Sequence, residues 1–267
     1  MSKVLIVGAS DGIGLALAEH YQKAGNTVIN VSRRDCPLEG VRNYRADMSK
    51  ESERLAALEY IAANDLLPDL FIYSAGASMC APVQHTEDDH LRYLWEVNYF
   101  GFVRMVQGLL PHLTQVKGKI VAVSSMAAVA PIPFDAHYSA SKAALDAFLA
   151  VLSQEVAPLG IRVTSVLPGG TATEFTFKRL IYDQAHCGRY YAEAQKSAFT
   201  LGKMEQTGMS PDKAAQYIAK HVDEGRGLYY PVGPTNGATY ALCKLLPQAV
   251  KGAIIRALYG SDGKSSN

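Results

Sequence analysis

Residues 3–25 read KVLIVGASDGIGLALAEHYQKAG, and this stretch decides the fold. Its first part, residues 4–7, is a short apolar run rich in β-branched residues, as is typical of a strand buried on both faces. Gly8, Gly12 and Gly14 follow, and then an apolar stretch with the character of a helix. A strand, a glycine turn and a helix in this order direct unpaired backbone N–H groups and a helix dipole at a phosphate. The spacing differs from G-x-G-x-x-G, and such glycines can also be purely structural, so the turn alone is weak support for a nucleotide site.

The rest of the chain continues the alternation of strands and helices. Strands are expected at residues 3–8, 27–32, 42–45, 69–73, 118–124, 161–166 and 227–230, and helices at 12–24, 50–63, 86–115, 136–158 and 211–222. Such alternation predicts an α/β fold, a Rossmann-like doubly wound parallel sheet of about seven strands with helices on both faces. No linker or shift in composition divides the chain, so we expect one domain over 1–267.

Composition narrows the class of protein. The chain has 267 residues, 48% of them hydrophobic, and a net charge of +1, which argues against a nucleic-acid-binding surface. The four cysteines are scattered and lack metal-ligand spacing, so we expect reduced thiols, no metal site and a cytoplasmic protein. The chain opens directly into a predicted strand, so we expect no signal peptide, and no apolar run reaches the roughly 18 residues of a membrane span.

Three residues of the central region form a candidate catalytic group. Tyr138 and Lys142 are four residues apart in HYSASKAALDAF, and Ser125 precedes Tyr138 by thirteen residues. Side chains four residues apart share one face of a helix. An ammonium beside a phenol is expected to lower the phenol's pKa from about 10, which suits general acid–base catalysis. Alone, the pair is better explained by an ordinary amphipathic helix with a surface lysine and a half-buried tyrosine. The glycine turn upstream reverses that preference.

In combination, these motifs resemble the short-chain dehydrogenase/reductase family, in its single-domain branch. Ser74 departs from the pattern, because the family has asparagine at that position. The matching positions lie in order along residues 4–174: Gly8-Ala9-Ser10-Asp11-Gly12-Ile13-Gly14, Asp47, Ser74-Ala75-Gly76, Asn98, Ser125, Tyr138, Lys142, Pro168-Gly169, Thr171 and Thr173.

The resemblance implies a role for each catalytic position. Tyr138 would exchange a proton with the substrate oxygen, and Ser125, favoured over Ser124 by its interval, would hold that oxygen. Lys142 would tune Tyr138 and bind the nicotinamide ribose, while Asn98 would anchor a water of a proton relay. The cofactor-binding positions would be Gly8, Ser10, Asp11, Gly12, Ile13, Gly14, Ser32, Arg33, Arg34, Asp47, Met48, Ser74, Ala75, Gly76, Tyr138, Lys142, Pro168, Gly169, Thr171 and Thr173.

The end of the second predicted strand bears on the choice of cofactor. An acidic residue there would bind the adenosine 2′-hydroxyl and repel a 2′-phosphate, but the position is Ser32, followed by Arg33 and Arg34. A guanidinium chelates phosphate, so NADP(H) is favoured and NAD(H) remains the alternative. Asp11 opposes this assignment, because its carboxylate would repel a phosphate.

Two further segments bear on the substrate and on partners. Residues 174–210 fall where relatives carry a lid, and their aromatic residues indicate a lipophilic ketone or alcohol, such as a steroid, retinoid or keto-lipid, unless they only pack the lid. Residues 239–259 form an amphipathic helical pattern, with Pro247 expected to start a helix. Packing on the domain or on a second subunit is the favoured explanation of this pattern, and a membrane surface is the alternative. A homodimer or homotetramer is expected.

The expected function is hydride transfer between a nicotinamide cofactor and a carbonyl/alcohol pair. A sugar-nucleotide epimerase or dehydratase is a second hypothesis, since that branch also uses a Tyr–Lys pair. A non-catalytic NADP-binding regulatory protein is a third.

Overall fold

A single seven-stranded sheet forms the centre of the molecule, which we describe from a computed structural model over residues 2–225 and 227–259. Its strand order is β3-β2-β1-β4-β6-β7-β9, and every neighbouring pair is parallel. The strands are β1 (Lys3–Val7), β2 (Thr27–Ser32), β3 (Arg42–Arg45), β4 (Leu70–Tyr73), β6 (Lys119–Val123), β7 (Arg162–Leu167) and β9 (Tyr229–Pro231). Each of the seven predicted strands is confirmed to within two residues at its ends.

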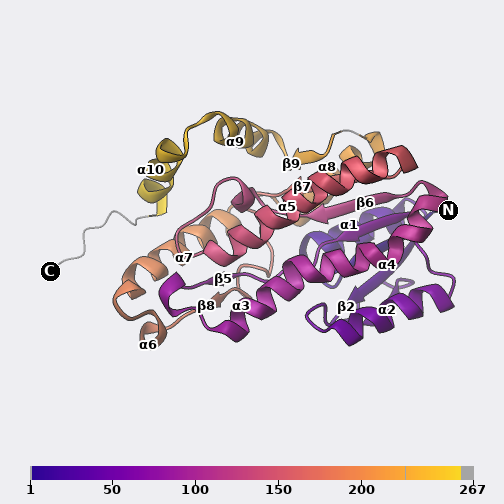
Figure 1. Ribbon diagram of the computed structural model, residues 1–267, viewed down its shortest axis with the longest axis horizontal. Helices are drawn as coiled ribbons and strands as arrows, with labels where there is room; N and C mark the ends of the chain where they lie inside the picture. The colour runs from indigo at the N-terminus through magenta and orange to yellow at the C-terminus, as the bar shows by residue number, and fades with distance from the viewer. Residues whose placement is uncertain (1, 226, 260–267) are drawn as a thin grey trace.

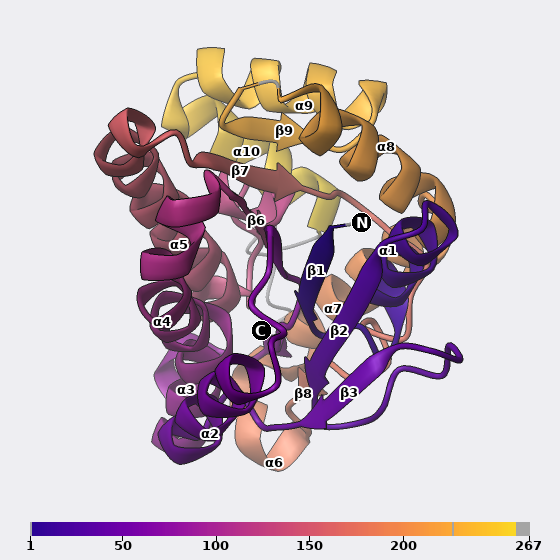
Figure 2. The same ribbon diagram turned by 90° about the vertical axis from the view of Figure 1, so that its right-hand side faces the viewer.

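Helices cover both faces of this sheet, as the doubly wound prediction requires (Figure 2). One face packs on α2, α4 and α5, and the other packs on α1 and α8. The α-helices are α1 (Gly12–Lys23), α2 (Glu51–Ala63), α3 (Asp88–Trp95), α4 (Gly101–Val116), α5 (Ala136–Val156), α6 (Gln184–Cys187), α7 (Tyr191–Gln206), α8 (Pro211–Glu224), α9 (Pro234–Leu245) and α10 (Gln248–Tyr259).

Burial of the strands on both faces explains their sequence. Along β1, Leu5 and Val7 face the α2–α4–α5 side, whereas Val4 and Ile6 face the α1–α8 side, and all four are buried. A strand with two buried faces has no polar positions, which is why residues 4–7 read as a continuous apolar run.

The glycine turn after β1 is tightly packed. Gly8 has a φ of +97°, and a Cβ there would lie 2.8 Å from the backbone nitrogen of Ala75. A Cβ on Gly14 would lie 2.1 Å from the carbonyl oxygen of Gly8. Only glycine fits at either position. Because no Cβ stands in the way, the turn packs directly against the loop after β4 at the carboxyl edge of the sheet.

The helical stretch predicted near 86–115 is confirmed from Asp88 to Val116, but a π-helical segment, Glu96–Phe100, lies between α3 and α4. The hydroxyl of Tyr73 donates to the carbonyl of Val97 at 2.6 Å. The Gly101 N–H bonds instead to the carbonyl of Glu96, five residues back. A buried tyrosine on the neighbouring strand therefore competes for the helix carbonyl and widens the turn that carries Asn98.

The amphipathic pattern over 239–259 forms two helices, because α9 ends at Leu245 and α10 begins at Gln248 (Figure 1). Leu246 between them is extended, with φ −74° and ψ 136°. A residue before proline is disfavoured in the helical region, which ends α9 there. Pro247 then accepts hydrogen bonds from Val250 and Lys251, so it precedes the second helix as expected.

A small parallel pair, β5 (Met79–Cys80) and β8 (Leu180–Ile181), lies outside the main sheet and was not predicted. It joins the loop after β4 to the segment after β7. Two-residue strands carry no periodicity that a sequence pattern can reveal.

None of the described helices has the length and apolar content of a segment that crosses a bilayer.

Removal of one core ring tests this packing. Phe102 is fully buried and contacts the rings of Phe71, Tyr73 and Phe148, whereas the neighbouring Phe100 is 43% exposed. We expect Phe102→Ala to lower the free energy of unfolding by about 3–5 kcal/mol, the usual cost of a phenylalanine-sized cavity. Urea denaturation checks this, with Phe100→Ala as the matched control at about 1 kcal/mol or less. Equal losses in the two variants would contradict the assigned core.

Candidate functional site

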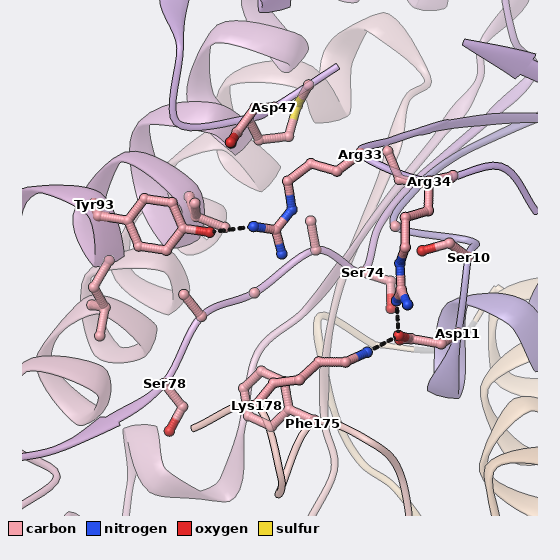
Figure 3. Close-up of a pocket in the computed structure, with 18 of the residues that line it drawn as sticks. Ser10, Asp11, Arg33, Arg34, Asp47, Ser74, Ser78, Tyr93, Phe175 and Lys178 are labelled. Carbon is pink, nitrogen blue, oxygen red and sulfur yellow. Dashed lines mark hydrogen bonds and ion pairs between the residues drawn. The ribbon is translucent and has the colours of Figure 1, made fainter. Parts of the chain in front are cut away.

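A cavity of about 400 Å³ lies at the carboxyl edge of the sheet, where β1, β2 and β4 end (Figure 3). Residues of the glycine turn, of the turn after β2 and of the loop after β4 form its walls. The expected cofactor positions that line it are Gly8, Ser10, Asp11, Ser32, Arg33, Arg34, Asp47, Met48, Ser74, Ala75 and Gly76. The structure therefore brings eleven of the twenty expected positions to one cavity.

Asp11 does not present a free carboxylate to this cavity. Its Oδ2 accepts hydrogen bonds from the guanidinium of Arg34 and from the ammonium of Lys178 (Figure 3). Both ion pairs are partly exposed, so each is weak on its own. The two cations nevertheless offset the charge of Asp11, which removes the main objection to an anion in the cavity.

Arg33 projects from the same turn toward a different wall. Its guanidinium donates to the hydroxyl of Tyr93 on α3 at 2.9 Å, and both side chains line the cavity (Figure 3). The Ser32 hydroxyl is used internally, because it donates to the carbonyl of Arg34 at 2.5 Å. Arg33 thus presents a cation to the cavity. Within residues 2–225 and 227–259, no carboxylate forms an ion pair with it.

Asn30, a buried residue of β2, holds the two turns together. Its Oδ1 accepts from the backbone of Ala9 at 3.0 Å, and its Nδ2 donates to the carbonyl of Arg34 at 3.2 Å. Sequence reasoning missed this residue. The signal was an asparagine between the apolar residues Ile29 and Val31 of the strand TVINVS.

Asp47 is partly occupied with local contacts. Its Oδ1 accepts from the backbone and the hydroxyl of Ser49, while its own N–H donates to Glu53. These bonds fix the turn that places Asp47 and Met48 in the cavity wall.

Several expected site residues lie outside the wall of this cavity. Ser125 and Pro168 do not line the cavity, nor do Gly12, Ile13, Gly14, Tyr138, Lys142, Gly169, Thr171 and Thr173. The reason lies in the segment after β7. Phe175 occupies the wall between the cavity and the catalytic residues, with its ring 6.0 Å from that of Tyr138 and its Cε2 3.6 Å from the Cβ position of Gly76.

Two of these outlying positions, Gly12 and Thr173, contact each other. A Cβ on Gly12 would lie 3.4 Å from the Cγ2 of Thr173. Within the segment after β7, the hydroxyl of Thr171 donates to the carbonyl of Gly169 at 3.3 Å. The segment after β7 therefore folds back against the glycine turn.

The candidate catalytic residues lie together at the adjoining edge. The side chain of Ser125 is hydrogen-bonded to the phenol of Tyr138, and it also accepts from the backbone of Ala127 at 3.1 Å. Ser124 points elsewhere and donates to the carbonyl of Lys142 at 3.4 Å. The structure thus places Ser125 rather than Ser124 beside Tyr138.

Lys142 approaches Tyr138 from the same helix face, as the spacing predicts. Its Nζ lies 5.8 Å from the centre of the Tyr138 ring and donates to the carbonyl of Val123 at 2.8 Å. Its side chain is buried, and burial lowers its pKa to about 8. The negative charge of Asp146, one turn further along α5, raises the pKa of Lys142 and so partly opposes the effect of burial.

The expected lowering of the Tyr138 pKa by Lys142 is wrong for this arrangement. Burial raises the pKa of the phenol above its ordinary value, and the hydrogen bond from Ser125 only partly opposes this. The ammonium of Lys142 bonds to a backbone carbonyl instead of the phenol. Tyr138 therefore carries its proton at neutral pH, and burial makes it a weaker acid than an exposed tyrosine.

Asn98 is fully engaged in hydrogen bonds from the π-helical segment. Its Oδ1 accepts from the N–H of Ala77 at 2.8 Å, and its Nδ2 donates to the carbonyl of Ala77 at 2.9 Å. The same Nδ2 donates to the hydroxyl of Ser141 at 3.0 Å, and Ser141 in turn donates to the carbonyl of Tyr138. Asn98 thereby joins the cavity loop to the helix that carries Tyr138 and Lys142.

The segment 174–210 is anchored by a buried ion pair. Arg179 donates to Glu205 at 2.5 Å and to the hydroxyl of Ser78, a cavity residue, at 3.1 Å. Asp135 is buried beside this pair, and burial raises its pKa well above the ordinary value. These contacts hold Phe175 and Lys178 over the cavity (Figure 3).

Sequence reasoning missed much of the far wall of the cavity. His90, Tyr93, Leu94 and Val97 line it from α3 and the turn that follows. They recur at intervals of three or four residues and end beside Asn98. That helical spacing, counted back from Asn98, could have identified the face.

The chain is similar to one family of known proteins, both in sequence and in structure. Residues 2–180 match the family described as short chain dehydrogenase. A 3-ketodihydrosphingosine reductase of Bacteroides thetaiotaomicron is 31% identical over 224 residues, which cover 82% of each chain. An NADPH-dependent 1-acyldihydroxyacetone phosphate reductase of Saccharomyces cerevisiae is 32% identical over 82% of this chain and 77% of that protein. The crystal structure of a short-chain dehydrogenase from Streptomyces avermitilis superimposes with a TM-score of 0.81 at 28% identity, covering 100% of both chains.

The buried amine of Lys142 makes a testable contribution to stability. Its pKa is about 8 in the folded protein against an ordinary value of 10.5, so between these values the unfolded chain holds a proton that the folded protein has released. Stability therefore rises with pH across this window, by about 2 kcal/mol between pH 7 and 9.5. The substitution Lys142→Met should remove this pH-dependent contribution to the free energy of unfolding.

Urea denaturation at both pH values, on the wild type and on Lys142→Met, measures the difference. The variant controls for all other titrating groups, because only Lys142 has changed. A wild type whose pH dependence equals that of the variant would contradict the buried position of the amine.

Proposed function

Because the chain belongs to the short-chain dehydrogenase family, we propose that it is an NADPH-dependent reductase of a lipophilic ketone. The observation that carries the proposal is the grouping of Tyr138, Ser125 and Lys142 beside a cavity built by a glycine turn.

The residues of the cavity fit a dinucleotide. Gly8 and Gly14 leave backbone space that a Cβ would fill, so a pyrophosphate can approach the N–H groups at the start of α1. The adenosine end would meet Asp47, Met48 and Arg33, and the nicotinamide end would meet Tyr138, Lys142, Thr171 and Thr173. When bound, the cofactor supplies the hydride.

The charges around the cavity support NADPH over NADH. Ser32 leaves no carboxylate at the end of β2, and the carboxylate of Asp11 is offset by Arg34 and Lys178. Arg33 then remains as a planar cation that can chelate a 2′-phosphate. One of the two enzymatic relatives named above is described as NADPH-dependent, in agreement with this choice.

The protein's own residues would perform the proton transfer. Ser125 would hydrogen-bond the substrate carbonyl and hold it against the phenol of Tyr138. The phenol of Tyr138 is in its protonated form and lies beside Ser125, so it would act as the general acid in reduction. Lys142 would hold the nicotinamide ribose and supply a positive charge beside it. Asn98 would position Tyr138 and Lys142 through its hydrogen bond to Ser141 on the same helix.

An apolar substrate agrees with the walls nearest the catalytic group. Phe175, Met79, Leu94 and Leu180 line the cavity on that side. The segment 174–210 would act as a lid over the substrate. The two named enzymatic relatives are described as reductases of 3-ketodihydrosphingosine and of 1-acyldihydroxyacetone phosphate. A long-chain keto-lipid is therefore the substrate class that we assign.

Tyr138→Phe tests the assigned acid. The variant keeps the ring but removes the proton, so we expect kcat to fall by roughly 10²–10⁴-fold while NADPH affinity stays within about threefold of the wild type. Absorbance of the reduced nicotinamide follows turnover on a panel of ketones, and fluorescence titration follows NADPH. Tyr44→Phe, a change in a tyrosine stacked on Tyr60 away from the site, is the matched control. Loss of NADPH binding with unchanged kcat would show that Tyr138 has another role.

Arg33→Ala tests the cofactor assignment. Removal of a charge-assisted contact to phosphate should weaken NADPH binding by about 10–100-fold and leave NADH nearly unchanged. Arg42→Ala, an exposed arginine of β3 outside the cavity, should alter neither affinity. An equal loss for both cofactors in Arg33→Ala would contradict a 2′-phosphate contact.

A further inference from the structure

The two C-terminal helices turn their apolar side chains away from the domain. On α9, Leu242 is 53% and Leu245 is 82% exposed; on α10, Ile254 is 44% and Leu258 is 61% exposed. No residue of α9 is buried, and Tyr259 is the only buried residue of α10. Packing on the domain, one of the two explanations favoured from the sequence, therefore does not account for this apolar pattern.

The exposed apolar residues recur at helical spacing. Leu242 and Leu245 are three residues apart, and Val250, Ile254 and Leu258 follow one another at intervals of four. Each helix thus presents an apolar stripe along one side. We call Leu242, Leu245, Val250, Ile254 and Leu258 the apolar stripes.

The charges on the same helices have one sign. Between residues 234 and 259 the charged residues are Lys244, Lys251 and Arg256, and there is no aspartate or glutamate. Lys244 lies against the rings of Tyr229 and Tyr240. The rest of the chain is nearly balanced, since the net charge of the whole is +1. Basic residues beside an exposed apolar stripe are complementary to a surface that combines anionic groups with an apolar interior.

We propose that α9 and α10 dock the protein on an anionic lipid surface, with the apolar stripes entering the acyl boundary. A second copy that presented the same two helices would bring cations of like sign together, whereas anionic headgroups would neutralise them. The lipid surface is thus the occupant that satisfies both the apolar and the charged residues of these helices.

The position of α10 connects this surface with the candidate site. Figure 1 shows α10 above α7, and the hydroxyl of Tyr259 at the end of α10 bonds to the sulfur of Met204 on α7 at 3.4 Å. α7 belongs to the segment 174–210, whose Phe175 and Lys178 reach the cavity. Docking by α9 and α10 therefore brings the proposed lid next to the lipid phase. This consequence rests on the proposed function, but the docking itself does not.

Flotation of the full-length protein with vesicles tests the docking without cofactor or substrate. The probes are vesicles of phosphatidylcholine alone and of phosphatidylcholine with phosphatidylglycerol, at low and high salt. We expect the wild type to float with the anionic vesicles and to dissociate at high salt. The double variant Leu245→Glu/Ile254→Glu should lower the partition coefficient at least tenfold. Leu55→Glu, at a residue of α2 that is 54% exposed, should have no effect.

A second variant separates charge from apolar contact and does not depend on how the first one folds. Lys251→Gln/Arg256→Gln keeps the stripes intact, and it should reduce binding to anionic vesicles while leaving the weak binding to neutral vesicles unchanged. Wild-type protein that stays unbound to both vesicle types would overturn the proposal. So would a wild-type dimer that Leu245→Glu/Ile254→Glu converts to a monomer without any vesicle binding, because a second copy would then cover the stripes. Retained activity with no vesicle binding would overturn the docking alone and leave the proposed function standing.

Discussion

The side-chain amide of Asn98 is the contact on which the arrangement of the site depends. It pairs with both backbone groups of Ala77, much as a neighbouring strand would, and it also reaches Ser141 on α5. The loop after β4, the π-helical turn and the catalytic helix are thus joined by one buried residue. Each bond contributes only about 1 kcal/mol net, but leaving the groups of Ala77 buried and unpaired would cost more. Gly76, Lys142 and Tyr138 owe their relative positions to this pairing.

A second constraint is electrostatic and connects the glycine turn with the segment after β7. Asp11 lies between Arg34 and Lys178, so the turn that faces a phosphate and the segment that covers the cavity share one carboxylate. An anion in the cavity would compete with Asp11 for both cations. Anion binding in the cavity and the position of the segment 174–210 are therefore coupled through these charges. The ion pairs are all partly exposed, so salt weakens the coupling.

The parts of the fold that follow from local sequence were predictable. Residues 4–7 are apolar because both faces of β1 are buried, and Gly8 and Gly14 are glycines because no Cβ fits there. The spacing from Tyr138 to Lys142 placed both side chains on one helix face, where the structure also has them. Pairings between distant residues were not predictable. The hydroxyl of Tyr73 that opens the π-helical turn, the partners of Asp11 and the Tyr93 contact of Arg33 join residues 23 to 167 positions apart. The pKa of Tyr138 also depends on burial by such distant segments, which is why the expected direction was wrong.

Amide hydrogen exchange at Ala77 tests the role of Asn98 most directly. In the wild type the N–H of Ala77 should be strongly protected, because its acceptor is a buried side chain. In Asn98→Ala that protection should fall at least a hundredfold, while the amides of β6 and β7 exchange as before. Unchanged protection of Ala77 in the variant would contradict the account, since the loop would then be held in place without Asn98.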